Sequence, residues 1–236
     1  MTITRLAEGI GTVTLRRSRR ARRFGIRVTL FDGVLVTVPW FASYASAMEA
    51  VQRNRRWILK EMDRAGEQQR QFGAHSEGEC VTRAHRLLVE QGDVGTTMVR
   101  VRSGVIAVRF PRTLHLDSTP VRRAIQSGIL AAYRIEAHAY LPGRARELAD
   151  RHGFSYRRLF IKDLRSRWGS CSVVNNINLA LQLMRLSDDL VDYVILHELA
   201  HTKVKDHGAG FWRLLEQVSG DAKGLDRRLR KERLWE

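Results

Sequence analysis

The sequence predicts an α+β fold, with strands gathered in the N-terminal half and helices in the C-terminal half. Two observations support this class. Short segments rich in β-branched residues that alternate with polar ones lie before residue 111. Longer segments with apolar residues at helical spacing dominate after residue 118. We therefore expect a β-rich N-terminal subdomain with one helix over residues 1–115, and a helical domain with a short sheet over residues 116–236.

The first predicted strands are residues 12–15, 26–30 and 34–38, with the Phe-Asp-Gly of 31–33 as a hairpin turn. Between the first two strands, residues 16–23 hold six arginines in eight positions. Such a run is typical of a nucleic-acid-binding arm or of a connection whose charges face water. We favour the solvated connection for the fold and leave contact with a polyanion open.

The next predicted element is a single helix over residues 43–70, because Ala47, Val51 and Ile58 lie near helical spacing. Trp57 follows four basic or polar residues in R-N-R-R-W and could stack on a nucleic-acid base. We favour packing of this tryptophan against a sheet.

Further strands are predicted at residues 79–82, 85–90, 97–101 and 105–110, with glycines at the turns. His85 has no second ligand at metal-binding spacing, so we expect a core histidine. Residues 111–120 resemble a loop and are the candidate boundary between the halves.

The C-terminal half begins with a long predicted helix from Ser118 to about residue 152, which Pro142-Gly143 should kink or interrupt. Residues 156–164 predict a strand, and the segment R-S-R-W-G-S-C-S-V-V-N-N-I-N-L-A-L predicts a turn and a second strand. The pair Asn175-Asn176 suits a tight turn there.

The segment D-Y-V-I-L-H-E-L-A-H over residues 192–201 carries the strongest chemical signal, H-E-x-x-H. Residues four apart on a helix share one face, so His197 and His201 can reach one ion, with Glu198 beside them. This spacing is the zinc-hydrolase signature. Its neighbours are apolar, so a bound dication would offset the cost of burying these groups. The alternative is a pair of core histidines without a metal.

A third ligand is expected to follow the helix. His207, six residues after His201, is the preferred candidate, with Asp206 capping a new helix whose first residue turns back to the metal. Glu216 is the alternative ligand, although a solvated helix position suits it better. Ser187 is expected to cap the metal-binding helix.

Several motifs together resemble one family. H-E-L-A-H-x5-H-G-x-x-F-W, R-W-G-S-C-S at 167–172, I-N-L at 177–179, and the earlier R-S-R-R-A-R-R-F-G-I-R-V and R-W-I-L-K resemble the YgjP-like metallopeptidase domain family. SprT-like proteases are more distant relatives. The resemblance implies a zincin-like catalytic half whose strand pair lines the substrate cleft. After I-N-L the chain reads A-L-Q-L-M-R-L-S, which departs from the usual N-W-R-L followed by proline.

The expected chemistry is that of a zinc-dependent peptidase with one Zn²⁺ per chain and Glu198 as general base. Arg167 and the backbone at Gly169 are candidates for oxyanion contact, or else they support the metal helix. Cys171 is either an inhibitory metal-binding thiol or, as we favour, a small buried side chain. Peptides or proteins are the expected substrates.

The formal net charge of +16 leaves other functions open. It indicates affinity for nucleic acid or another polyanion, or only an arginine-rich genome. The alternatives are a metal-dependent hydrolase of nucleotide phosphoanhydrides or phosphate esters, and a basic DNA-associated protein, either a protease of DNA-bound proteins or a binding module. Two distant cysteines and the lack of an apolar run or leader predict a cytoplasmic protein without membrane contact.

Overall fold

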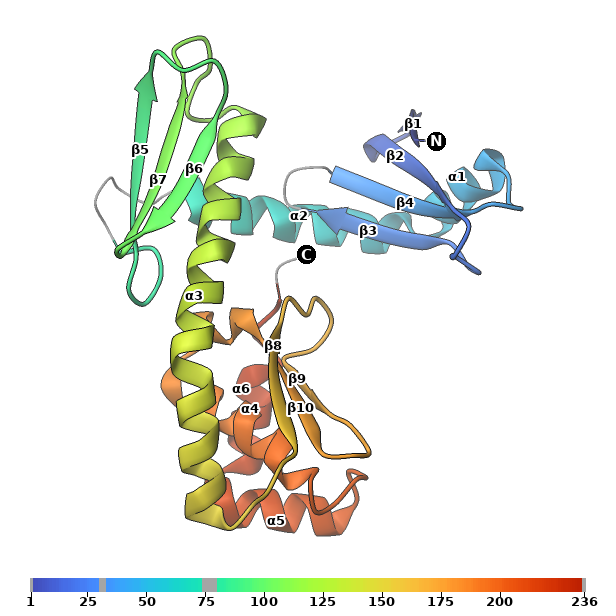
Figure 1. Ribbon diagram of the computed structural model, residues 1–236. Coiled ribbons are helices and arrows are strands. Elements are labelled where there is room, and N and C mark those ends of the chain that lie inside the picture. Colours follow the sequence, from blue (N-terminus) through green and yellow to red (C-terminus); the bar gives the residue numbers. More distant parts are fainter. Residues whose placement is uncertain (1, 30–32, 74–79, 235–236) are drawn as a thin grey trace. The chain divides into compact units, whose positions relative to one another are not determined.

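The computed structural model describes residues 2–29, 33–73 and 80–234, without the side chains of residues 67–73 (Figure 1). It confirms the α+β class, with strands at the N-terminus and a largely helical C-terminal half. The chain forms two compact units: residues 1–76 with 115–123, and residues 77–114 with 124–235. The strands between residues 86 and 111 therefore belong to the second unit. The division into domains at residue 115 stays a prediction.

The first unit contains a four-stranded sheet in the order β1-β2-β4-β3. Its strands are β1 (Thr2–Ala7), β2 (Gly11–Ser18), β3 (Gly25–Thr29) and β4 (Gly33–Pro39). β2 pairs with β4 in parallel, while β1 and β3 run antiparallel to their neighbours. The three predicted strands are confirmed, and β1 was not predicted. Most of the predicted turn at 31–33 lies outside the described residues.

Two helices, α1 (Tyr44–Arg53) and α2 (Arg55–Gly73), replace the single helix predicted over 43–70. The break is at Asn54, whose side-chain Nδ2 donates to the Ala50 carbonyl at 2.8 Å and competes with the regular helical bonds. The prediction that Trp57 is a core residue is wrong, because this side chain is 45% exposed. Ile58, the next residue, is fully buried instead.

The second unit begins with a sheet in the order β5-β7-β6. Its strands are β5 (Arg86–Gly92), β6 (Met98–Arg102) and β7 (Val105–Pro111). The strand predicted at 79–82 is not formed by residues 80–82, the part of it that the structure describes, since Cys80 makes only an isolated bridge to Arg86. His85 is buried, as expected, and its Nδ1 lies 2.8 Å from Glu136 Oε1.

The long helix α3 (Thr119–His152) packs against this sheet, because a Cβ added at Gly128 would lie 2.5 Å from Ile106 Cγ2. Pro142 does not interrupt it, contrary to the prediction. Leu141 and Ala145, on either side of the proline, are fully buried. Their packing compensates for the hydrogen bond that proline removes.

The rest of the second unit carries the site. Its strands are β8 (Arg158–Lys162), β9 (Gly169–Cys171) and β10 (Asn176–Ala180), in the order β8-β10-β9. Asn175 has a φ of 57°, as the predicted tight turn requires. The helices are the 3₁₀ turn η1 (Leu181–Arg185), α4 (Asp188–Ala200), α5 (Ala209–Ser219) and α6 (Ala222–Leu229). Among the described helices, none is both long and apolar enough to cross a membrane.

Candidate metal centre

The helix α4 carries the H-E-x-x-H motif and is buried on most of its surface. A two-bond ion pair attaches it to α3: Arg144 Nε donates to Asp192 Oδ1 at 2.7 Å, and Nη2 donates to the other carboxylate oxygen at 2.5 Å. Both side chains are only about one-fifth exposed. Because a bidentate guanidinium pair restrains distance and orientation together, it sets the position of α4 against α3.

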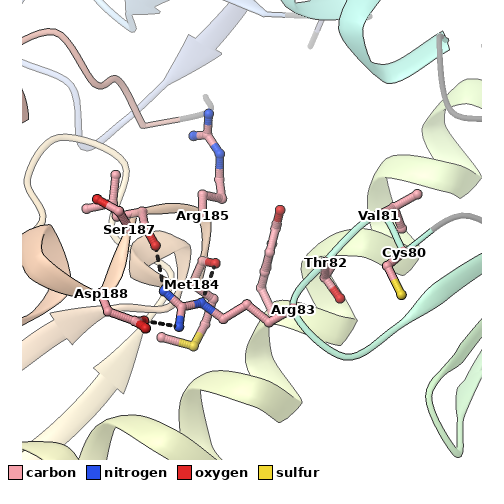
Figure 2. A pocket seen from close by; sticks show the side chains of 10 residues that line it. Cys80, Val81, Thr82, Arg83, Met184, Arg185, Ser187 and Asp188 are labelled. Atoms are coloured by element: carbon pink, nitrogen blue, oxygen red, sulfur yellow. Dashed lines mark hydrogen bonds and ion pairs between the residues drawn. The ribbon is translucent and has the colours of Figure 1, made fainter.

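The beginning of α4 is held by Arg83, which lies before β5 (Figure 2). Its guanidinium donates to the carbonyls of Met184 and Leu186 and pairs with the Asp188 carboxylate. Ser187 occupies the N-cap position, but its hydroxyl donates to the Asp189 carboxylate instead of accepting a backbone N–H. The prediction of a side-chain cap there is therefore wrong, because a carboxylate two residues away is the stronger acceptor.

Three imidazoles converge at the other end of α4. His207 Nε2 lies 3.2 Å from His201 Nε2 and 3.2 Å from His197 Nε2. One ring nitrogen from each histidine lies within 4.8 Å of the other two, and this is the group of potential metal ligands found within the described residues. Neighbouring ligands about 2.0–2.1 Å from a tetrahedral Zn²⁺ are roughly 3.3 Å apart. The separations of His207 from each of the other two histidines therefore match a single ion of this size.

The orientation of the rings has two local causes. His201 Nδ1 donates to the Val204 carbonyl at 3.0 Å, which leaves Nε2 as the atom that faces His207. Phe211 of α5 is fully buried and contacts all three rings, with centroids 4.4 Å from His201, 4.9 Å from His197 and 4.8 Å from His207. In the sequence this phenylalanine appeared only as part of the motif H-G-x-x-F-W, and its contact with all three imidazoles was missed.

His207 lies on the exposed segment between α4 and α5. Asp206 Oδ1 accepts the Gly208 N–H at 2.7 Å, and this local turn directs the intervening histidine to the cluster. Helix α5 begins at Ala209 with Gly208 at the cap position, so the prediction that Asp206 caps this helix is wrong. Glu216 is exposed, and its carboxylate accepts the Ala222 N–H between α5 and α6.

Glu198 is 5% exposed and points to β9. A Cβ added at Gly169 would lie 2.7 Å from both Cγ and Oε1 of Glu198, so the strand backbone and the carboxylate are in close contact. Its second oxygen, Oε2, is buried and has no hydrogen-bond partner among the described protein groups. A buried carboxylate oxygen without a partner is costly unless a cation or water completes the site.

Burial determines the protonation of these groups. It raises the pKa of Glu198 to about 8, although the positive charge of Arg167 acts in the opposite direction. Burial, together with the two neighbouring imidazoles, lowers the pKa of His197 to about 4. Burial also lowers the pKa of His201. Both histidines are therefore neutral at pH 7, the form in which imidazole binds metals.

Cys171 of β9 is half-buried and does not belong to the histidine cluster described above. Lys205 Nζ lies 3.8 Å from its sulfur and also donates to the Ser172 carbonyl and to Asn175 Oδ1. Burial raises the pKa of the Cys171 thiol, so the neutral thiol is favoured. These contacts tie the segment after α4 to the β9–β10 turn.

Three converging imidazoles, two of them on the same helix as a buried glutamate, are characteristic of metal-dependent hydrolases. The model of the family described as YgjP-like, metallopeptidase domain, matches residues 22–232, and the chain belongs to this family. The protein is accordingly a metallopeptidase, and peptides or proteins are its substrates.

Two solved structures are similar over part of the chain. The crystal structure of the metallopeptidase zymogen of Pyrococcus abyssi abylysin is 27% identical, with a TM-score of 0.35 over 40% of this chain and 98% of that one. The crystal structure of the metallopeptidase zymogen of Methanocaldococcus jannaschii jannalysin is 21% identical, with a TM-score of 0.35 over 38% and 93% of the two chains. No curated protein matches the chain.

Proposed function

We propose that this metallopeptidase is zinc-dependent, that His197, His201 and His207 hold one Zn²⁺ per chain, and that Glu198 is the general base. The observation that carries the proposal is the convergence of three ring nitrogens, with two separations of 3.2 Å, beside a buried carboxylate. Imidazole nitrogens at this spacing suit zinc, and three protein ligands leave a coordination position open for water or substrate.

When bound, the ion would polarise a scissile carbonyl and lower the pKa of a water toward ~7. Glu198 adjoins the first ligand on the same helix, and the positive charge of a bound ion would lower the pKa of its carboxyl from the metal-free value of about 8, so that the carboxylate can accept the proton of that water. The same carboxyl would then return the proton to the leaving amine. Contact with Gly169 limits the movement of the side chain, so the carboxylate is held in one orientation.

We propose that an extended peptide lies along β9. This strand pairs with β10 on one side and is an edge strand within the described sheet, so its other side can accept a further strand. Arg167, which is exposed and immediately precedes Trp168 and β9, and the backbone at Gly169 are the candidates for contact with the developing oxyanion. Gly169 lies against Glu198, and the positive charge of Arg167 acts to lower the pKa of the same carboxyl.

The test is metal content by elemental analysis of purified wild type, His201→Ala, His207→Ala and a control variant, His138→Ala. His138 is an exposed histidine of α3 in the same unit. Casein and nucleotide hydrolysis are assayed on the same samples. We expect about one zinc per chain in wild type and in the control, loss of zinc in the other two variants, and casein cleavage that follows zinc content.

Zinc retained by both site variants would contradict the three-histidine site. Zinc-dependent hydrolysis of nucleotides without proteolysis would support the phosphoanhydride or phosphate-ester hydrolase and exclude the peptidase mechanism proposed above.

We also propose a cytoplasmic location, on the basis of two free cysteines. Cell fractionation tests it, and recovery of the protein outside the cytoplasm would contradict it.

A further inference from the structure

The N-terminal sheet of the first unit brings together two segments that are distant in sequence. β2 and β3 flank β4, with Ser18 opposite Pro39 on one side and Gly25 opposite Thr37 on the other. The connection from β2 to β3 must therefore pass across the C-terminal end of β4. The arginine-rich segment and the residues that follow β4 consequently lie at the same end of the sheet, which we call the basic-aromatic end.

The charges at the basic-aromatic end are not compensated. All six arginines of residues 16–23 are exposed. Within the described part of the chain, only Arg17 forms a side-chain interaction: its Nη1 donates to the Trp40 carbonyl at 2.9 Å, and its guanidinium lies 4.8 Å from the Tyr44 ring centroid. The sequence contains no aspartate or glutamate in residues 12–29 or 33–48. This end of the sheet therefore has a strongly positive potential.

Two exposed aromatic rings lie at the same end of the sheet as these arginines. Trp40 is 61% exposed and Phe41 is 64% exposed, directly after β4. Their centroids are 6.1 Å apart and their planes meet at 88°, so each ring leaves a face open to solvent. Large exposed apolar side chains beside unpaired positive charge indicate a binding surface. Burying such rings against a ligand would gain the hydrophobic free energy that is not gained while they face water.

We propose that the basic-aromatic end binds single-stranded nucleic acid, with the arginines on phosphates and Trp40 and Phe41 stacked on unpaired bases. Planar guanidinium groups contact phosphates bidentately, and aromatic side chains stack on any base that is not already stacked in a duplex. An anionic membrane surface would also attract the arginines, but two rings at right angles provide little apolar surface for insertion. The inference is independent of the metal centre and goes beyond the proposed peptidase function.

The experiment is fluorescence anisotropy with labelled oligo(dT) and oligo(U) of about 20 nucleotides, longer than the ~4–16 nucleotides that single-strand-binding folds cover. We compare wild type with a variant in which Arg19, Arg20, Arg22 and Arg23 are changed to Gln. The matched control changes four arginines of the second unit, Arg86, Arg100, Arg102 and Arg158, to Gln. All eight are exposed and without a side-chain partner among the described residues, so both variants should fold.

We expect wild type and the control to bind at least one oligomer, and the first variant to bind at least about tenfold more weakly. Its plot of log affinity against log salt should be flatter by up to about 3, because each phosphate contact on a single strand contributes ~0.7. Trp40→Ala should weaken binding about tenfold or more without changing the salt slope, since stacking is not electrostatic.

Four outcomes would overturn the proposal. These are no binding to either oligomer at low salt, an equal loss in the control variant, Trp40→Ala with wild-type affinity, and preferred binding to duplex of the same length. Vesicles of phosphatidylcholine with and without phosphatidylserine are tested in parallel. Binding to anionic vesicles in place of the oligomers would assign the surface to membranes instead. Casein cleavage is expected to be unchanged in all of these variants.

Discussion

Gly169→Ala is expected to damage catalysis without removing the metal. The new Cβ would lie 2.7 Å from Cγ and Oε1 of Glu198 and 2.9 Å from Cδ, whereas ordinary contacts begin at 3.4 Å. The carboxyl group or the strand must therefore move by about 0.7 Å. Glu198 is 5% exposed and has little room to rotate away.

The size of the effect follows from this displacement. A catalytic group misplaced by ~1 Å can cost about a hundredfold in rate, so we expect kcat to fall between about tenfold and a hundredfold. The histidines are not displaced directly, and zinc content should stay at the wild-type value. Overpacking of this kind also lowers the free energy of unfolding by about 1–3 kcal/mol.

The assay is casein or fluorogenic-peptide turnover with zinc content measured on the same samples. Gly143→Ala is the matched control, because nothing lies within 4 Å of a Cβ added there, and alanine stabilises a helix interior by about 0.5–1 kcal/mol relative to glycine. The control should keep full activity. Wild-type kcat in Gly169→Ala would refute the argument that contact with β9 holds Glu198 in its catalytic position.

Three further predictions concern the supports of the site. In metal-free protein treated with EDTA, Glu198→Gln should remove a pH dependence of the free energy of unfolding. Burial raises the pKa of Glu198 in the folded state to about 8 from 4.5, so only the folded state holds the proton between these two pH values. The free energy of unfolding of wild type therefore falls as pH rises through this window. Urea unfolding at pH 5.5 and 8 should show the stability difference between variant and wild type growing by on the order of 3 kcal/mol, and a constant difference would contradict it. Arg144→Lys should lose the two-bond pair with Asp192 and destabilise the protein by about 1–3 kcal/mol. The control, Arg146→Lys, changes an exposed neighbour and should leave the urea midpoint unchanged. Equal midpoints for both variants would show that the pair does not stabilise the fold. Phe211→Leu should keep the fold but weaken zinc binding about tenfold in a chelator competition, because leucine cannot reproduce the ring contacts with three imidazoles; an unchanged zinc affinity would exclude this supporting role.

Most strands and helices could be predicted from the sequence because their patterns are local. β-branched alternation located β2, β3 and β4, apolar spacing located α3, and the H-E-x-x-H spacing located α4. The failures are also physical. Asn54 splits a predicted helix through its own side chain, and Pro142 is tolerated because buried neighbours hold the helix together.

The candidate site divides in the same way. The shared helical face of His197 and His201, with Glu198 beside them, follows from the sequence alone, since an interval of four residues is about one helical turn whatever surrounds it. The contact of Gly169 with Glu198 and the contacts of Phe211 with the three imidazoles depend on the tertiary fold. The parallel register of β2 and β4 likewise brings the arginine-rich connection to Trp40. These contacts join residues far apart in the chain, and their positions depend on strand register and helix packing, which no local pattern specifies.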